Sequence, residues 1–260
     1  MRFGIVQMGG AETVEENLAQ IADFAKESAE SGCEAVCFPE CCLTGYDPER
    51  AEEKAVSPED ASLARAAELA KTHGIDLLIG FMEREGAQRY VTHALLRRDG
   101  TGESYRKTHL GKKESSFFEA GEHLAVWTLS CGLKAGIQLC VEGHFPEISQ
   151  TLALRGADVI FLPHAVPAAA GDRKTLWKRY IPARSYDNRI YMACCNVTDG
   201  ARFAGGCFVT GPDGAVIAER FSPQPALVCF GVEQDALRRW REEGGHHRWY
   251  PLHRRKALYE

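Results

Sequence analysis

Three reactive side chains of this sequence fall where predicted strands end. Glu40 closes the segment AVCFPE, Lys107 closes ESYRK, and Cys140 closes GIQLC. Because ligands of α/β proteins gather at the carboxyl ends of strands, we expect these side chains to share a site. A helix is predicted to begin just after Cys140, and a helix N-terminus and a nearby lysine both favour a thiolate. The predicted chemistry is attack by Cys140, with the backbone N–H of Val141 holding an oxyanion.

Each of these residues also has an ordinary structural interpretation. A lone cysteine at a strand end is most often a small buried hydrophobe, and a lone lysine or glutamate is most often solvated. A different catalytic interpretation pairs Cys140 with His144. Partners of a catalytic cysteine usually come from distant sequence, however, which disfavours that pair. The joint occurrence of the three residues at strand ends is what favours a site.

Strand–helix units of the first half must position Glu40 and Lys107. Residues 1–8 are predicted as a strand, 12–31 as a helix that stops at Gly32, and 33–40 as a second strand. Ser57 and Pro58 indicate the N-cap and first residue of a helix that ends near Gly74. A buried strand over 75–84 and a hairpin over 90–107 follow, with the hairpin turn at Asp99–Gly100.

The second half repeats this order around Cys140. Strands are predicted over 132–140, 157–163 and 190–197, with helices over 146–155 and around 177–188 between them. A hairpin over 207–220 and a strand over 226–232 complete the half. No linker separates the halves, so we predict one α/β domain over residues 1–260. Two sheets packed face to face with helices outside would bury all these strands.

Composition excludes several classes of protein. The 260 residues are 45% hydrophobic and 26% charged, as in ordinary globular proteins. The net charge of −5 argues against a nucleic-acid partner. Since there is no long apolar run and no signal peptide, we expect a cytoplasmic protein without a membrane partner.

The ten cysteines are therefore expected to be reduced thiols. Those at 33, 37, 41 and 42 match no paired metal-binding spacing, and small buried hydrophobes are the favoured interpretation. No metal site and no cofactor is predicted.

Three segments resemble the signature segments of the nitrilase, or carbon–nitrogen hydrolase, superfamily. They are FPECCLTGY (38–46), YRKTHL (105–110) and LCVEGHFPE (139–147), in the order that brings Glu, Lys and Cys. The segments LALRGADVIFLPHA and ARSYDNRIYMACCN extend the likeness, which covers the chain to about residue 235. The resemblance implies a four-layer αββα sandwich that hydrolyses a non-peptide C–N bond.

The resemblance also implies a role for each residue of the triad. Cys140 would attack a carbonyl or nitrile carbon, Glu40 would be the general base, and Lys107 would stabilise negative charge together with Val141. A further glutamate often follows the lysine in this family and positions the substrate. Glu114 fits that place best, and Glu119 is its rival.

Three further residues follow strand ends or lie on the next segment, namely Tyr46, His164 and Trp177. Each is expected either to line the substrate pocket or to pack in the core. Hydrolysis of a small-molecule amide or carbamoyl compound is the leading function. Nitrile-cleaving members usually carry a tryptophan directly after the nucleophile, where this chain has Val141, so a nitrilase is the runner-up. Acyl transfer and a catalytically silent binding subunit remain alternatives.

The last segment, residues 244–260, is aromatic and basic. Trp249, Tyr250 and Leu252 need apolar cover, so we expect this tail to pack on a partner subunit. The family resemblance likewise implies face-to-face homodimers or larger homo-oligomers.

Overall fold

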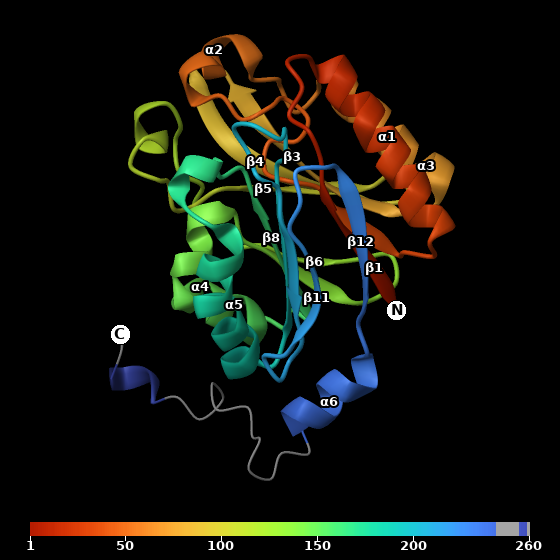
Figure 1. Ribbon diagram of the computed structural model, residues 1–260, viewed down its shortest axis with the longest axis vertical. Helices are drawn as coiled ribbons and strands as arrows, with labels where there is room; N and C mark the ends of the chain where they lie inside the picture. The colour runs from red at the N-terminus through yellow and green to blue at the C-terminus, as the bar shows by residue number, and fades with distance from the viewer. Residues whose placement is uncertain (243–254, 259–260) are drawn as a thin grey trace.

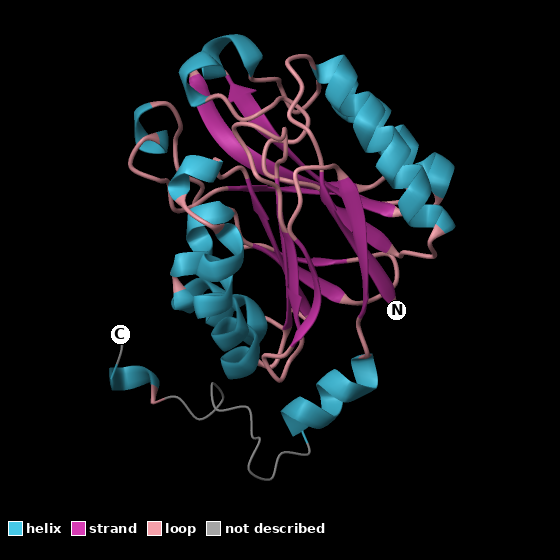
Figure 2. Ribbon diagram, viewed as in Figure 1, coloured by secondary structure: helices cyan, strands magenta, loops and turns pink. Residues whose placement is uncertain are grey.

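Two six-stranded sheets pack face to face, and helices cover both outer faces (Figures 1 and 2). This computed structural model describes residues 1–242 and 255–258. The strand order is β12-β1-β2-β3-β4-β5 in the first sheet and β11-β10-β9-β8-β7-β6 in the second. The predicted αββα sandwich is confirmed. Most of the predicted tail, residues 244–254 and 259–260, lies outside the described residues.

Glu40 and Cys140 follow strands from the parallel part of each sheet, whereas Lys107 follows β5, which pairs antiparallel with β4. In the first sheet β2 lies parallel to β1 and β3, and in the second sheet β8 lies parallel to β7 and β9. The first sheet contains β1 (Arg2–Gln7), β2 (Ala35–Cys37), β3 (Asp76–Glu85), β4 (Gln88–Leu96), β5 (Gly102–Arg106) and β12 (Ala226–Gly231). The second contains β6 (Val126–Thr128), β7 (Lys134–Ile137), β8 (Val159–His164), β9 (Tyr191–Asn196), β10 (Cys207–Thr210) and β11 (Val216–Arg220).

The outer layers consist of two pairs of helices. Helices α1 (Val14–Glu30) and α3 (Ala61–His73) cover the first sheet, and α4 (Pro146–Leu154) and α5 (Arg173–Asn188) cover the second (Figure 1). The shorter α2 (Ala51–Lys54) and α6 (Gln234–Glu242) lie at the periphery. Short 3₁₀ turns span Pro48–Arg50, Glu114–Ser116, Cys140–His144, Ala168–Ala170 and Lys256–Leu258.

The main core lies between the sheets because alternate strand residues point inward. Phe3 and Ile5 of β1 belong to this inner cluster, whereas Val6 packs outward beneath the helices. Phe3 meets Phe161 of β8 edge to face, with ring centroids 6.5 Å apart, and so joins the two sheets. The inner faces therefore form one continuous apolar layer.

Two predictions about the elements are wrong. The strand over 226–232 belongs to the first sheet, where β12 pairs antiparallel with β1, and not to the second half of the fold. The helix expected to start at Pro58, with Ser57 as its N-cap, starts at Ala61, because the Asp60 carboxylate accepts a hydrogen bond from the Ser62 N–H at 2.8 Å and caps it.

The four clustered cysteines do not converge. Cys37 and Cys41 belong to the core between the sheets, whereas Cys33 and Cys42 pack in the cluster under α1 and α3. Within the described residues, no helix combines the length and the apolar character needed to cross a bilayer.

Candidate active site

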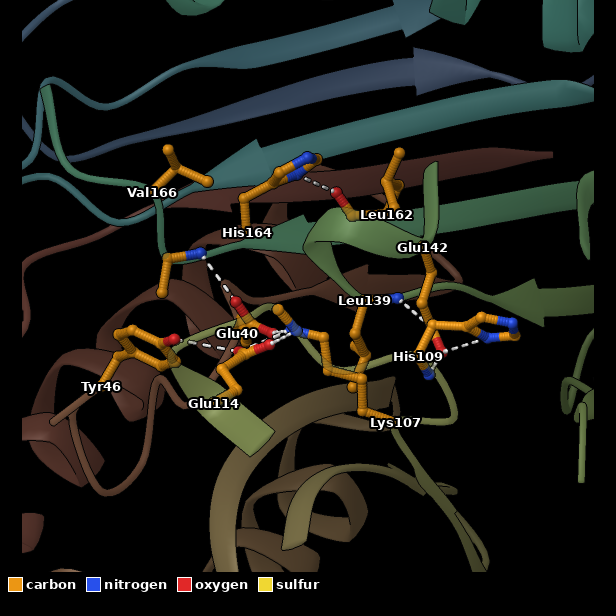
Figure 3. Close-up of polar contacts among 12 residues, drawn as sticks. Glu40, Tyr46, Lys107, His109, Glu114, Leu139, Glu142, Leu162, His164 and Val166 are labelled. Carbon is orange, nitrogen blue, oxygen red and sulfur yellow. Dashed lines mark hydrogen bonds and ion pairs between the residues drawn. The ribbon is translucent and has the colours of Figure 1, made fainter. Parts of the chain in front are cut away.

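Lys107 lies between two carboxylates. Its ammonium donates a hydrogen bond to Glu40 Oε1 at 2.8 Å and another to Glu114 Oε1 at 2.7 Å (Figure 3). All three side chains are buried. Lys107, Glu40 and Glu114 thus form one hydrogen-bonded group of ionisable side chains. Glu119 is exposed, so Glu114 is the glutamate that contacts the lysine.

The loop after β2 holds Glu40 close against β3. The N–H of Leu43 donates to the Gly80 carbonyl at 2.9 Å, and Cys41 adopts a left-handed φ of 53°. A Cβ on Gly80 would lie 2.5 Å from the backbone N of Cys41, so only glycine admits this approach. The other oxygen of Glu40 accepts a hydrogen bond from the N–H of Ala165, just after β8, at 3.1 Å. Glu40 therefore contacts both sheets.

Glu114 is positioned by the segment that follows Lys107. Its Oε2 accepts a hydrogen bond from the Gly111 N–H at 2.6 Å, and its Oε1 accepts one from the Tyr46 hydroxyl at 2.9 Å. Tyr46 comes from the loop after Glu40. The two loops that carry the carboxylates are thus tied to each other as well as to the lysine.

Cys140 occupies a strained position at the end of the segment that follows β7. It begins the 3₁₀ turn Cys140–His144 with a φ of 50°, a conformation that is uncommon for residues other than glycine. The helix predicted over 146–155 is present as α4, which begins at Pro146, and the 3₁₀ turn stands between Cys140 and its N-terminus. Within the described residues the Val141 N–H has no hydrogen-bond acceptor, which leaves it available to an oxyanion.

Glu142 is a buried residue of this site that the sequence reasoning missed. Its Oε2 accepts a hydrogen bond from the Leu139 N–H at 2.6 Å. Its Oε1 accepts hydrogen bonds from the Tyr105 hydroxyl and from both the N–H and the hydroxyl of Thr108, at 2.7–2.8 Å. Glu142 therefore ties the segment around Lys107 to the segment around Cys140 (Figure 3). A glutamate in a turn gives no sequence signal of such burial.

A cavity of about 350 Å³ opens at the thiol. Its lining includes Cys140 itself and, from the segments around it, Tyr46, Glu114, Val141, Ala165 and Val166. Tyr46 and Val141 thus lie where the sequence analysis expected a pocket. His144 instead stacks on Tyr180, with ring centroids 4.6 Å apart.

His164 and Trp177 do not line this cavity, and of the two expectations for them a position in the core is the one that fits their contacts. Their rings pack against each other at an interplanar angle of 50°, with centroids 4.7 Å apart, and both are buried. His164 donates from Nδ1 to the Leu162 carbonyl at 2.8 Å, and its ring points away from Glu40 and Lys107 (Figure 3). Burial lowers the pKa of His164 to about 3, so the ring is neutral. These residues pack behind the site.

Burial and the neighbouring charges set the protonation of the reactive groups. Burial raises the pKa of Glu40 to about 7, against the opposing effect of Lys107. Burial, and next the charge of Glu40, raises the pKa of the Cys140 thiol. Burial alone would lower the pKa of Lys107, but Glu40 and the other anionic groups outweigh it and raise that pKa. The raised pKa of Cys140 favours the neutral thiol over the thiolate that the sequence predicts.

The family model for carbon-nitrogen hydrolases matches residues 2–242. The chain is 28% identical to the omega-amidase of Xenopus tropicalis over 93% of its length and 92% of the relative's. It is 29% identical to a nitrilase of Pyrococcus abyssi over 78% of each chain.

Among solved structures, an amidase of the nitrilase superfamily from Nesterenkonia AN1 superposes with a TM-score of 0.86 at 27% identity, covering 100% of this chain and 95% of that one. In a variant of that amidase the active-site cysteine carries the acetamide moiety of fluoroacetamide, and another variant was solved with butyramide.

Proposed function

Since the chain belongs to the carbon–nitrogen hydrolase family, we propose that it hydrolyses a small-molecule amide through a thioester on Cys140, releasing ammonia or an amine. The observation that carries this proposal is the arrangement at one cavity. Cys140 and Glu114 line that cavity, and Lys107 is hydrogen-bonded to both Glu114 and Glu40. The similar proteins include an omega-amidase and the Nesterenkonia amidase whose active-site cysteine carries a covalently added acetamide moiety. Both support an amide substrate.

In the acylation step, Cys140 Sγ attacks the amide carbon while Glu40 accepts the thiol proton. Because the pKa of the thiol is raised, the proton moves as the S–C bond forms. The carbonyl oxygen becomes an oxyanion, which the Val141 N–H and the Lys107 ammonium stabilise. Collapse of this intermediate breaks the C–N bond, Glu40 returns its proton to the leaving nitrogen, and a thioester remains.

In the deacylation step, water attacks the thioester carbonyl and Glu40 accepts a proton from that water. The S–C bond then breaks, the sulfur recovers a proton from Glu40, and a carboxylic acid leaves. Glu114 acts as a positioning residue, because it accepts a second hydrogen bond from the Lys107 ammonium that also donates to Glu40. The reaction consumes only substrate and water.

A nitrile is the second candidate substrate, favoured by the likeness to the Pyrococcus abyssi nitrilase. The same attack on a nitrile carbon gives a thioimidate in place of a thioester. Val141 stands where nitrile-cleaving members usually have tryptophan, and for that reason we place the amide first.

Ammonia release from paired amides and nitriles of equal chain length tests the proposal. We expect release from the amides, and its loss in Cys140→Ser, where the weaker hydroxyl nucleophile replaces the thiol. Release that survives Cys140→Ser would remove the thiol from the mechanism. Tight binding of amides without any release would favour the silent binding subunit instead.

A further inference from the structure

Two cysteines far apart in the chain bring their thiols together on the outer face of the first sheet. Cys33 Sγ lies 3.6 Å from Cys229 Sγ, although 196 positions separate the two residues. Both pack in the apolar cluster beneath α1 and α3. A disulfide holds its sulfurs about 2 Å apart, so these thiols need to approach by only about 1.5 Å to be joined. The proposed amide hydrolysis makes no use of this pair.

The backbone on both sides fixes the two thiols. Cys229 lies within β12, where it pairs with Gly4 of β1. The residues on either side of Gly4 point into the core between the sheets, so Gly4 faces the helices and adds no side chain between the cysteines. Cys33 follows the end of α1, and its N–H donates to the Ser28 carbonyl at 3.0 Å. The sulfur contact is therefore a consequence of the sheet register and of the turn after α1.

The two thiols differ in their access to solvent. Cys229 is half-buried, whereas Cys33 is only 7% exposed. Burial, and next the interaction with Cys229, raises the pKa of Cys33 to about 12. A small oxidant therefore meets the sulfur of Cys229 first, and Cys33 stands behind it as the second thiol. Cys37 and Cys195 of the inner core are fully buried and lack this access.

A cross-link at this place would hold β12. This strand forms the edge of the first sheet, and within the described residues it pairs with β1 alone (Figure 1). An edge strand has one neighbour, so its separation from the sheet breaks fewer hydrogen bonds than that of a central strand. Cys33 lies on the far side of β1, just before β2. A bond from Cys229 to Cys33 would therefore tie the edge strand across β1.

We propose that Cys33 and Cys229 form an oxidation site, at which hydrogen peroxide converts the thiol pair to a disulfide that fastens β12. The Cys229 thiolate attacks one peroxide oxygen, the O–O bond breaks, and a sulfenic acid and water form. The Cys33 sulfur then attacks the sulfenic sulfur, the S–O bond breaks, and the departing hydroxide takes the Cys33 proton. Two thiols and one hydrogen peroxide thus give one disulfide and two waters. The site is independent of the proposed amide hydrolysis.

Treatment of the wild-type protein with hydrogen peroxide tests the site. We expect non-reducing peptide mass spectrometry to show the Cys33 peptide joined to the Cys229 peptide, about two mass units below the sum of the free peptides. The melting temperature should rise by about 5–15 °C, because a disulfide restricts the unfolded chain, and dithiothreitol should reverse the rise. Hydrogen exchange of the β12 amides should slow by about tenfold or more.

Three variants assign the two roles. Cys33→Ser removes the second thiol, so peroxide should leave Cys229 as a sulfenic acid that dimedone labels. Cys229→Ser removes the accessible thiol, and Cys33 should then stay unlabelled. Both variants should lose the rise in melting temperature that peroxide causes. Cys131→Ser removes a half-buried cysteine outside the pair, and should keep both the cross-link and the rise.

Two results would overturn the site. Cys33 and Cys229 that remain separate thiols, after enough peroxide to oxidise another cysteine, would show that the pair does not form a disulfide. A cross-link without a rise in melting temperature or slower exchange would show that the bond does not fasten β12. The wild-type protein gives both results, so the test does not depend on a variant that folds. Ammonia release is measured separately under reducing conditions, and its absence would leave the oxidation site standing.

Discussion

The Glu142 carboxylate accepts two hydrogen bonds from Thr108, one from its N–H at 2.8 Å and one from its hydroxyl at 2.7 Å. Thr108 directly follows Lys107, and Glu142 lies two residues after Cys140. These segments leave strands of different sheets, β5 and β7. The contact therefore fixes the lysine relative to the nucleophile across the interface of the sandwich.

Glu142→Gln should impair turnover, although residue 142 takes no part in the chemical steps. Hydrogen-bond donors face both carboxylate oxygens, so the amide group of glutamine would meet a donor in either orientation. We expect turnover to fall about 100-fold, the loss that a small misplacement of catalytic groups causes. Glu142→Asp keeps the charge and should retain more activity. Steady-state kinetics below the melting temperature checks this, and full activity of the glutamine variant would show that the contact does not position the site.

Gly80→Ala should displace Glu40. The added Cβ would lie 2.5 Å from the backbone N of Cys41, and such overpacking typically costs about 1–3 kcal/mol. Both the unfolding free energy and kcat should fall. Gly231→Ala is the matched control, because its Cβ would meet nothing within 4 Å. An alanine at 80 with unchanged kcat would mean that the loop tolerates a shift of the glutamate.

The pH profile should report the ionisation of Glu40. Burial raises the pKa of this carboxyl to about 7, and only its ionised form accepts the thiol proton. Activity is therefore present above pH 7 and lost as the pH falls below it, and log kcat/KM should rise with an apparent pKa near 7. The charge of Glu114 helps to raise the pKa of Glu40, so Glu114→Gln should move this limb to lower pH. A limb near the ordinary carboxyl range in the wild-type enzyme would contradict the raised pKa of Glu40.

Brief treatment with iodoacetamide should label Cys140 before the other nine cysteines. This reagent is itself a small amide, the thiol opens onto the cavity, and Glu40, whose charge acts on the thiol, is the base proposed to accept its proton. Seven cysteines are fully buried, and Cys131 and Cys229 are the half-buried competitors. Peptide mass spectrometry gives the order of labelling. Labelling of Cys131 or Cys229 while Cys140 stays unlabelled would show that Cys140 is not the reactive thiol.

Local sequence signals predict much of this fold and site. The helix over Val14–Glu30 has apolar residues at helical spacing, a Thr13 cap and a stop at Gly32, so its bounds are readable. Glu40, Lys107 and Cys140 are recognisable because each follows a strand within a distinctive segment. They meet because β2 and β5 run in the same direction in one sheet and β7 lies in the facing sheet.

The parts that could not be predicted depend on contacts between residues far apart in the chain. The β1–β12 pairing joins residues more than 200 positions apart, and nothing local to the last strand specifies its sheet. The burial of Glu142 depends on donors from Tyr105 and Thr108, and a turn glutamate is ordinarily solvated. Trp177 on a helix fits a pocket or a core equally well until its neighbours are known.

The most direct test of the central claim is the intact mass of the Glu40→Gln variant after mixing with a good substrate. Glutamine cannot deprotonate the water that attacks the thioester, so turnover should fall by about two to four orders of magnitude and the acylated enzyme should accumulate. We expect an adduct on Cys140 with the mass of the acyl group. A thioimidate, about one mass unit lighter because N–H replaces oxygen, would indicate a nitrile substrate instead. Near wild-type turnover in this variant, or an adduct on any other residue, would contradict the mechanism.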